Sequence, residues 1–168
     1  MPGPADTMQG DVPVTLTSQY NRVYPLASPG VGVDWAVTVP GGVRWNVQSL
    51  LATLTTSAVV ANRLALLRIS DGSTIHTRLP ANAAVVASST NYFSWVIGGQ
   101  EYAPASMVTY QTLPFPNYWL PSGWVISSST VAIDVGDQWS GLVLYVLEQR
   151  TGGPPPASVE QSLTVPSS

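Results

Sequence analysis

The chain contains no cysteine and no lysine, and only 9% of its 168 residues are charged. Without cysteine it has no disulfides and no thiolate metal sites. Without lysine it lacks Schiff-base chemistry and the phosphate-gripping loop of P-loop enzymes. Soluble domains usually carry about a quarter charged residues, because charge keeps a solitary surface in solution. A chain with so little charge and 45% apolar residues is suited to working packed against other proteins.

Two further features are missing, a basic stripe and a membrane segment. The net charge is −3, and the six positive residues are scattered arginines: Arg22, Arg44, Arg63, Arg68, Arg78 and Arg150. Nothing in this arrangement would neutralise a row of phosphates, so we expect no nucleic-acid partner. The opening residues lack the basic and apolar regions of a signal peptide. The longest apolar stretches, such as Leu142–Leu147, are far too short to cross a bilayer, so we expect no membrane partner.

What the chain does have is a series of strand-like runs separated by turn residues. Runs rich in valine, threonine, isoleucine and aromatics are predicted at 34–39, 43–55, 64–70, 74–79, 89–97, 124–135 and 138–150. The breaks include Pro40-Gly41-Gly42, Asp71-Gly72 and Gly136-Asp137. Such breaks favour hairpins, because glycine supplies positive φ and aspartate supports local turns. Almost nothing has helical periodicity.

The run from Val43 changes the parity of its apolar residues. Trp45 and Val47 alternate with polar residues, and the apolar set then moves to Leu50 and Leu54. A one-residue shift turns every side chain to the other face. We therefore predict a β-bulge or bend near Gln48–Leu51, at which a long strand could pass between two sheets.

The last strand is apolar on both faces. Alternation places Trp139, Val143, Tyr145 and Leu147 on one face, and Leu142, Leu144 and Val146 on the other. A strand of this kind is covered on both sides. The second cover could come from a loop of the same chain or from a neighbouring subunit.

These patterns predict an all-β fold, an antiparallel β-sandwich of about eight strands, most consistent with a jelly roll. A Greek-key sandwich of another topology is the alternative, because local patterns do not reveal strand order. We expect three parts: an N-terminal arm at 1–11, the sandwich domain at 12–150, and a C-terminal arm at 151–168. The last arm contains Gly152-Gly153-Pro154-Pro155-Pro156 and reads as non-globular.

The sequence offers little for catalysis. The only histidine, His76, has no nearby nucleophile elbow and no second histidine for a metal. We interpret it as a solvent-facing residue of a short strand. Asp134 and Asp137 flank Val135-Gly136; a carboxylate pair or a Ca²⁺ site is conceivable, but a hairpin turn is the better interpretation. We therefore predict that the protein is not an enzyme and that it has no catalytic residues, cofactor or metal.

The strongest local anomaly is aromatic. The segment 113–124 holds four aromatics and three prolines: Phe115, Tyr118, Trp119 and Trp124, with Pro114, Pro116 and Pro121. Aromatics on a stiffened loop bring large contact area at low entropic cost. Three interpretations remain open. These four side chains could plug one end of the sandwich, anchor a protein interface, or stack on sugar rings.

The stretch from Val43-Arg44-Trp45 through Leu54 to Arg63, continuing to Asp71-Gly72, resembles structural proteins of tailed bacteriophages, as does Asp137-Gln138-Trp139-Ser140 before a hydrophobic strand. Among these, a small acidic jelly roll with extended arms is similar to head decoration (cement) proteins. The resemblance covers about 100 residues and is one of pattern, so no ligand residue transfers from it. A tail or fibre component would look much the same.

The resemblance implies a protein that sits on the outer capsid surface of a virion and stabilises the shell by binding major capsid proteins. It also implies a homo-oligomer, with a trimer favoured, made in the host cytoplasm. A carbohydrate-binding module, with a glycan as partner, is the alternative. A small β-sandwich hydrolase is the least favoured, for want of an acid–base pair.

Overall fold

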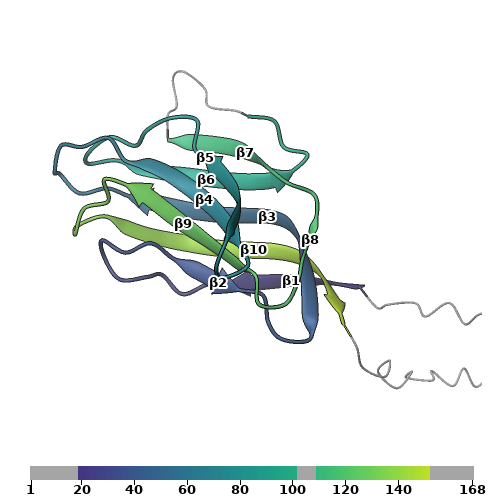
Figure 1. Ribbon diagram of the computed structural model, residues 1–168. Coiled ribbons are helices and arrows are strands. Elements are labelled where there is room, and N and C mark those ends of the chain that lie inside the picture. The colour runs from purple at the N-terminus through teal and green to yellow at the C-terminus, as the bar shows by residue number, and fades with distance from the viewer. Residues whose placement is uncertain (1–18, 102–108, 152–168) are drawn as a thin grey trace, which may run out of the picture.

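A computed structural model describes residues 19–101 and 109–151. The predicted arms at 1–11 and 151–168 lie outside the described residues, except for Thr151. Within the described residues there is no helix long and apolar enough to span a membrane. The described residues form ten strands (Figure 1): β1 Gln19–Pro25, β2 Ala36–Thr38, β3 Val43–Thr55, β4 Leu64–Ser70, β5 Ile75–Pro80, β6 Thr90–Ile97, β7 Tyr110–Phe115, β8 Trp119–Leu120, β9 Val125–Val131 and β10 Gln138–Arg150.

The strands form two packed sheets, as predicted for an all-β sandwich. One has six strands in the order β1-β10-β3-β6-β7, with β8 paired to β3, and the other has the order β2-β9-β4-β5. Pairs of strands are nested in sequence and alternate between the sheets: β1 with β10, β2 with β9, β3 with β6, and β4 with β5. One long hairpin rolled around a core gives this order, which is that of a jelly roll.

One strand pairing departs from the expectation of a purely antiparallel fold. β7 pairs with β6 in parallel, which requires the longer connection between them. The sequence pattern did not single out β1, β7 or β8.

The core lies between the sheets and is built from alternate side chains of both. Trp45, Leu50, Trp95 and Trp139 are among its largest buried members, and Leu67, Ile69 and Ile126 face them from the four-stranded sheet. Along β4 and β9, buried residues alternate with more exposed ones, so every second side chain faces the core. Burying these side chains is the main stabilising term of the fold.

The predicted bulge in β3 is confirmed. Tyr145 pairs with Ser49 and the next residue, Val146, pairs with Val47, so Gln48 is the extra residue. Leu50 is buried and Leu51 is exposed as a result. The suggested passage between sheets is wrong, because β3 stays in the six-stranded sheet along its whole length.

A second bulge corrects the predicted faces of β10. Ser140 pairs with Thr53 and Val143 with Leu51, which leaves an extra residue in β10 where Gly141 has a φ of 57°. The parity change turns Trp139 inward with Leu142, Leu144 and Val146. The outer set is therefore Val143, Tyr145 and Leu147 only, and Tyr145 is exposed.

Candidate functional site

The outer face of the six-stranded sheet carries no charged residue over its central rows. Cross-strand pairs align Val23, Tyr145, Ser49, Val96 and Pro114 in one row. The next rows contain Val143, Leu51, Ser94 and Thr112, then Thr53, Tyr92 and Tyr110. Five large apolar side chains on this face are between 37% and 57% exposed: Val23, Leu51, Tyr92, Tyr110 and Tyr145. Isolated exposed apolar residues are normal, but a contiguous group on one face indicates a contact surface.

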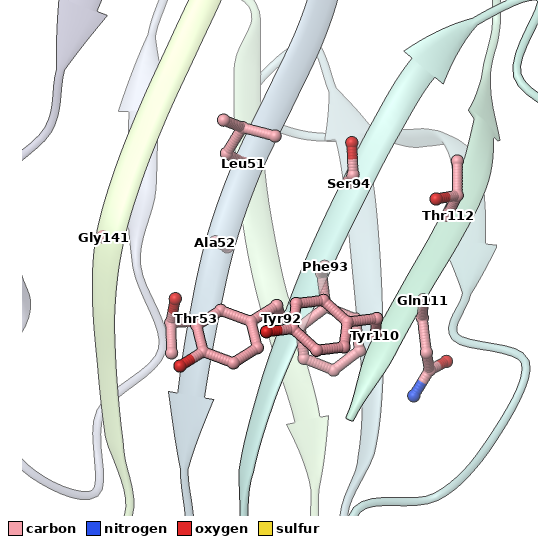
Figure 2. Close-up of a pocket in the computed structure, with 10 residues that line it drawn as sticks. All are labelled: Leu51, Ala52, Thr53, Tyr92, Phe93, Ser94, Tyr110, Gln111, Thr112 and Gly141. Carbon is pink, nitrogen blue, oxygen red and sulfur yellow. The ribbon is translucent and has the colours of Figure 1, made fainter. Parts of the chain in front are cut away.

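A hollow of about 330 Å³ opens on this face. The rings of Tyr92 and Tyr110 stack at 4.8 Å between centroids and 14° between planes. Figure 2 shows these rings side by side across β6 and β7, with Leu51 farther along β3. Small residues line the space between them: Gly141, Thr53, Ser94 and Thr112. The lining contains no carboxylate and no histidine, so it fits an apolar side chain with a few hydroxyl contacts rather than acid–base chemistry.

The structure separates the four aromatic residues predicted as contacts. Phe115 is buried in the core, whereas Trp119 lies beneath the guanidinium of Arg44, 4.8 Å from the ring centroid to Cζ. Tyr118 and Trp124 meet edge to face at 6.5 Å, both packed partly against the core. A surface made by all four side chains is therefore not one continuous patch, and their role as interface or glycan contacts stays a prediction.

His76 lies on the surface, as its sequence context indicated. Its ring stacks on Trp124 at 4.7 Å, and its Nε2 lies 2.9 Å from Asp71 Oδ2. Asp71 also accepts hydrogen bonds from the backbone N–H groups of Thr74 and Ser73. These backbone bonds, with the His76 contact, hold the pKa of Asp71 well below its usual range. In the described part of the chain, no three His, Asp or Glu side chains are grouped to hold a metal ion.

Asp134 and Asp137 form the predicted turn, closed by the Asp137 N–H donating to the Asp134 carbonyl at 2.9 Å. The turn also has a partner that sequence reasoning missed. Arg63 Nε donates to Asp137 Oδ2 at 3.0 Å, and both side chains are 0% exposed. Asp137 Oδ1 accepts the Ser57 N–H at 2.8 Å, and Ser57 Oγ donates to Asp134 Oδ1 at 2.9 Å. This buried network joins the loop at 56–63 to the turn at 132–137.

The pKa of Asp137 follows from this environment. Burial alone raises the pKa of a carboxyl, but hydrogen bonds from the Ser57 and Asp134 backbone and from the Arg63 guanidinium outweigh it, so the pKa lies below its usual range. The pKa of Tyr24 is shifted in the opposite direction, upward. Its hydroxyl donates a hydrogen bond to the buried Glu148. Burial and the Glu148 carboxylate raise the pKa of Tyr24. These groups hold strands and loops together, and none of them is among the residues that line the hollow on the sheet face.

No family model matches the chain, and no curated protein matches it. Among solved structures, the chain is similar to the coat protein dimer of Tobacco streak virus, with 9% identity over 86% of this chain and 94% of that chain and a TM-score of 0.35. A second crystal form of that coat protein gives 9% identity, 84% and 94% coverage and a TM-score of 0.34. A structure of the Gx strain of infectious bursal disease virus gives 12% identity, 79% and 39% coverage and a TM-score of 0.24. At such scores these likenesses carry no argument, and the jelly-roll assignment rests on the strand pairing itself.

Proposed function

We propose that this protein is a non-enzymatic structural component of a virus particle that packs against neighbouring proteins through the outer face of its six-stranded sheet. The observation that carries the proposal is that face itself, uncharged in its central rows and bearing five partly exposed large apolar side chains. Burial of such side chains on association is favourable, at roughly 25 cal/mol per Å² of apolar surface before the costs of association.

The composition and the fold support the same function. A chain in which only 9% of the residues are charged is poorly suited to remaining a free monomer in solution. Jelly rolls recur in viral capsid and lectin domains, although a fold alone does not fix a function. The proposed function therefore depends on the contact face, and the fold is only consistent with it.

The more specific form of the proposal follows the resemblance to head decoration proteins. In that form, the protein binds major capsid proteins of a tailed bacteriophage, lies on the outer capsid surface, and assembles as a homo-oligomer, a trimer being favoured. Its arms at 1–11 and 151–168 would lie across neighbouring shell proteins. A tail or fibre component of the same virion is the alternative placement.

The test is co-sedimentation with shells assembled from the major capsid protein of the same virus. The wild-type protein should sediment with the shells, and Tyr145→Glu should not, because it introduces a charge into the centre of the contact face. Ile75→Glu is the matched control, since Ile75 is similarly exposed on the β4–β5 hairpin away from that face. Equal binding by wild type and Tyr145→Glu would contradict the proposed face, and no sedimentation of the wild type would contradict decoration.

Carbohydrate binding is the second candidate, favoured by the partly exposed rings of Tyr118, Trp119 and Trp124. Partly exposed rings beside polar groups suit stacking on a sugar, and Trp124 is flanked by His76 at 4.7 Å. A glycan array tests it: binding that is lost in Trp124→Ala and Trp119→Ala supports it, and no binding to any glycan excludes it. Phe115→Ala does not serve this test, because Phe115 is buried and its loss would disturb the core.

A further inference from the structure

A second apolar surface lies at the end of the sandwich opposite to the ends of the described chain. Seven valines there are each at least 52% exposed: Val31, Val33, Val59, Val60, Val86, Val131 and Val135. They account for seven of the thirteen large hydrophobic residues that are exposed in the described ranges. Figure 1 shows the loops after β1, β3, β5 and β9 gathered at this end, while β1 begins and β10 ends at the other. We call these seven residues the valine end.

The valine end is held rigidly from within. The Gly32 N–H donates to the Asp137 carbonyl at 2.7 Å, and a Cβ on Gly32 would lie 2.7 Å from the Val135 Cα. Arg63 Nη1 donates to the carbonyls of Val59 and Ala61 at 2.7 and 2.9 Å. The buried Arg63–Asp137 ion pair therefore fixes three loops against one another with their valines outward. Preorganised apolar contacts bind without a large ordering cost.

The chemistry of this end favours a protein partner over a lipid surface. Peripheral membrane sites combine basic residues with aromatic side chains. Across residues 29–34, 56–63, 81–89 and 131–137 there is no aromatic residue, and the single basic residue, Arg63, is fully buried. The three carboxylates in these ranges, Asp34, Asp134 and Asp137, all accept hydrogen bonds from groups of the same chain. A surface of aliphatic side chains whose neighbouring carboxylates are already hydrogen-bonded within the chain favours an apolar counterpart.

The chain itself carries such a counterpart. The hollow between Leu51 and the stacked Tyr92 and Tyr110 is lined mainly by apolar atoms and holds about 330 Å³. A space of this size admits aliphatic side chains such as valine. Thr53 in the hollow lies two residues from Thr55 at the end of β3, about 7 Å along the strand. The hollow thus opens beside the valine end and is continuous with the proposed contact face.

From these observations we propose that the valine end of one copy, led by Val60 and Val135, inserts into the Tyr92–Tyr110 hollow of a second copy of this chain. Val60 is 93% exposed and Val135 82% exposed, the two largest values among the large hydrophobic residues that the structure describes. The contact joins two different surfaces of the chain. Two copies can therefore make it reciprocally in a two-fold dimer, or several copies can make it head to tail in a closed ring. This inference rests on the proposed function, in which the outer face of the six-stranded sheet is a contact surface. It adds that a second copy of the chain is one of the partners on that face.

The absence of cysteine permits a direct test. Val60→Cys protein is mixed with Ser94→Cys protein carrying a mass tag, and the mixture is oxidised gently. Because a disulfide forms only when the two Cα atoms come within about 7 Å, we expect about tenfold more mixed dimer than from Val60→Cys with Ile75→Cys. Equal yields from the two mixtures, or a Val60–Val60 product in excess of both, would overturn the proposal.

Self-association gives a second readout. Val60→Asp should weaken it by at least about tenfold, since a buried carboxylate without a partner is costly, while Ile75→Asp should leave it unchanged. A wild-type protein that stays monomeric overturns the inference, as does wild-type binding to phosphatidylcholine–phosphatidylserine vesicles that Val60→Asp abolishes. If Tyr145→Glu prevents shell binding but neither Val60 variant has an effect, this inference fails and the proposed function stands. If the wild-type protein does not bind shells but forms the expected cross-link, the proposed function fails and this inference stands.

Discussion

Replacing Asp137 by alanine should destabilise the protein more than any other single change to a charged residue. Arg63 and Asp137 are 0% exposed and lie 3.0 Å apart, and Asp137 also accepts the N–H groups of Ser57 and Asp134 at 2.8 Å each. The substitution would leave the guanidinium of Arg63 buried without its counter-ion. Breaking a buried pair in this way costs about 3–5 kcal/mol. For a chain of this size that corresponds to a fall in Tm of about 6–20 °C.

Thermal unfolding followed by calorimetry and far-UV circular dichroism at pH 7 measures this effect. Asp71→Ala is the matched control, because Asp71 forms a comparable set of turn hydrogen bonds on the surface, and it should lower Tm far less. The double variant Arg63→Met, Asp137→Asn should lose less stability than the sum of the single variants, since the two residues are in contact. A cost below about 1 kcal/mol for Asp137→Ala, or strict additivity in the double variant, would refute the buried pair as a stabilising element.

Three further predictions follow from the bulges and the carboxylates. Leu50→Ala should cost about 2–5 kcal/mol and Leu51→Ala less than about 1 kcal/mol, because the bulge in β3 buries the first and exposes the second; equal costs in urea denaturation would contradict the register. Gly141→Ala should cost about 1–2 kcal/mol, since a φ of 57° is unfavourable for a residue with a Cβ, and a neutral result in the same assay would mean that the bulge relaxes. The pKa of Asp137 is lowered in the folded state, so its stabilisation is complete above the unfolded value of about 4 and is lost as the pH falls below it. The Tm of the wild type should therefore fall as the pH drops below about 4, more steeply than that of Asp137→Asn, and parallel curves would contradict this assignment.

The local parts of the fold could be read from the sequence because their causes are local. Glycine-bearing breaks such as Asp71-Gly72 mark hairpins, and the shift from Val47 to Leu50 marks a bulge, since a period of two residues cannot tolerate an insertion. Gly141 gave no such indication, because Leu142 to Leu147 are all apolar and either parity looks acceptable. The order of the strands could not be read in this way, since nested pairs such as β1 with β10 join segments more than a hundred residues apart.

The candidate site depended still more on distant contacts. The valines at 31, 60 and 135 look like unrelated loop residues in the sequence and meet only because the jelly roll brings their loops to one end. Arg63 and Asp137 are 74 residues apart, so the sequence showed a turn and a lone arginine without the pair. The aromatic segment stood out by its composition. The burial of Phe115 and the separate positions of Trp119 and Trp124 depend on tertiary structure, which composition does not reveal. Composition did indicate a shortage of charge in the chain, and the sheet face and the valine end are the two apolar surfaces on which this shortage appears.

The central claim is that neighbouring copies cover these uncharged surfaces, and the native mass of the full chain tests it most directly. Sedimentation equilibrium or native mass spectrometry over a concentration series should give a multiple of the 17.8 kDa chain mass, and Tyr145→Glu should shift the distribution to the single chain. A mass of 17.8 kDa for the wild type at every concentration, with no change in Tyr145→Glu, would contradict it.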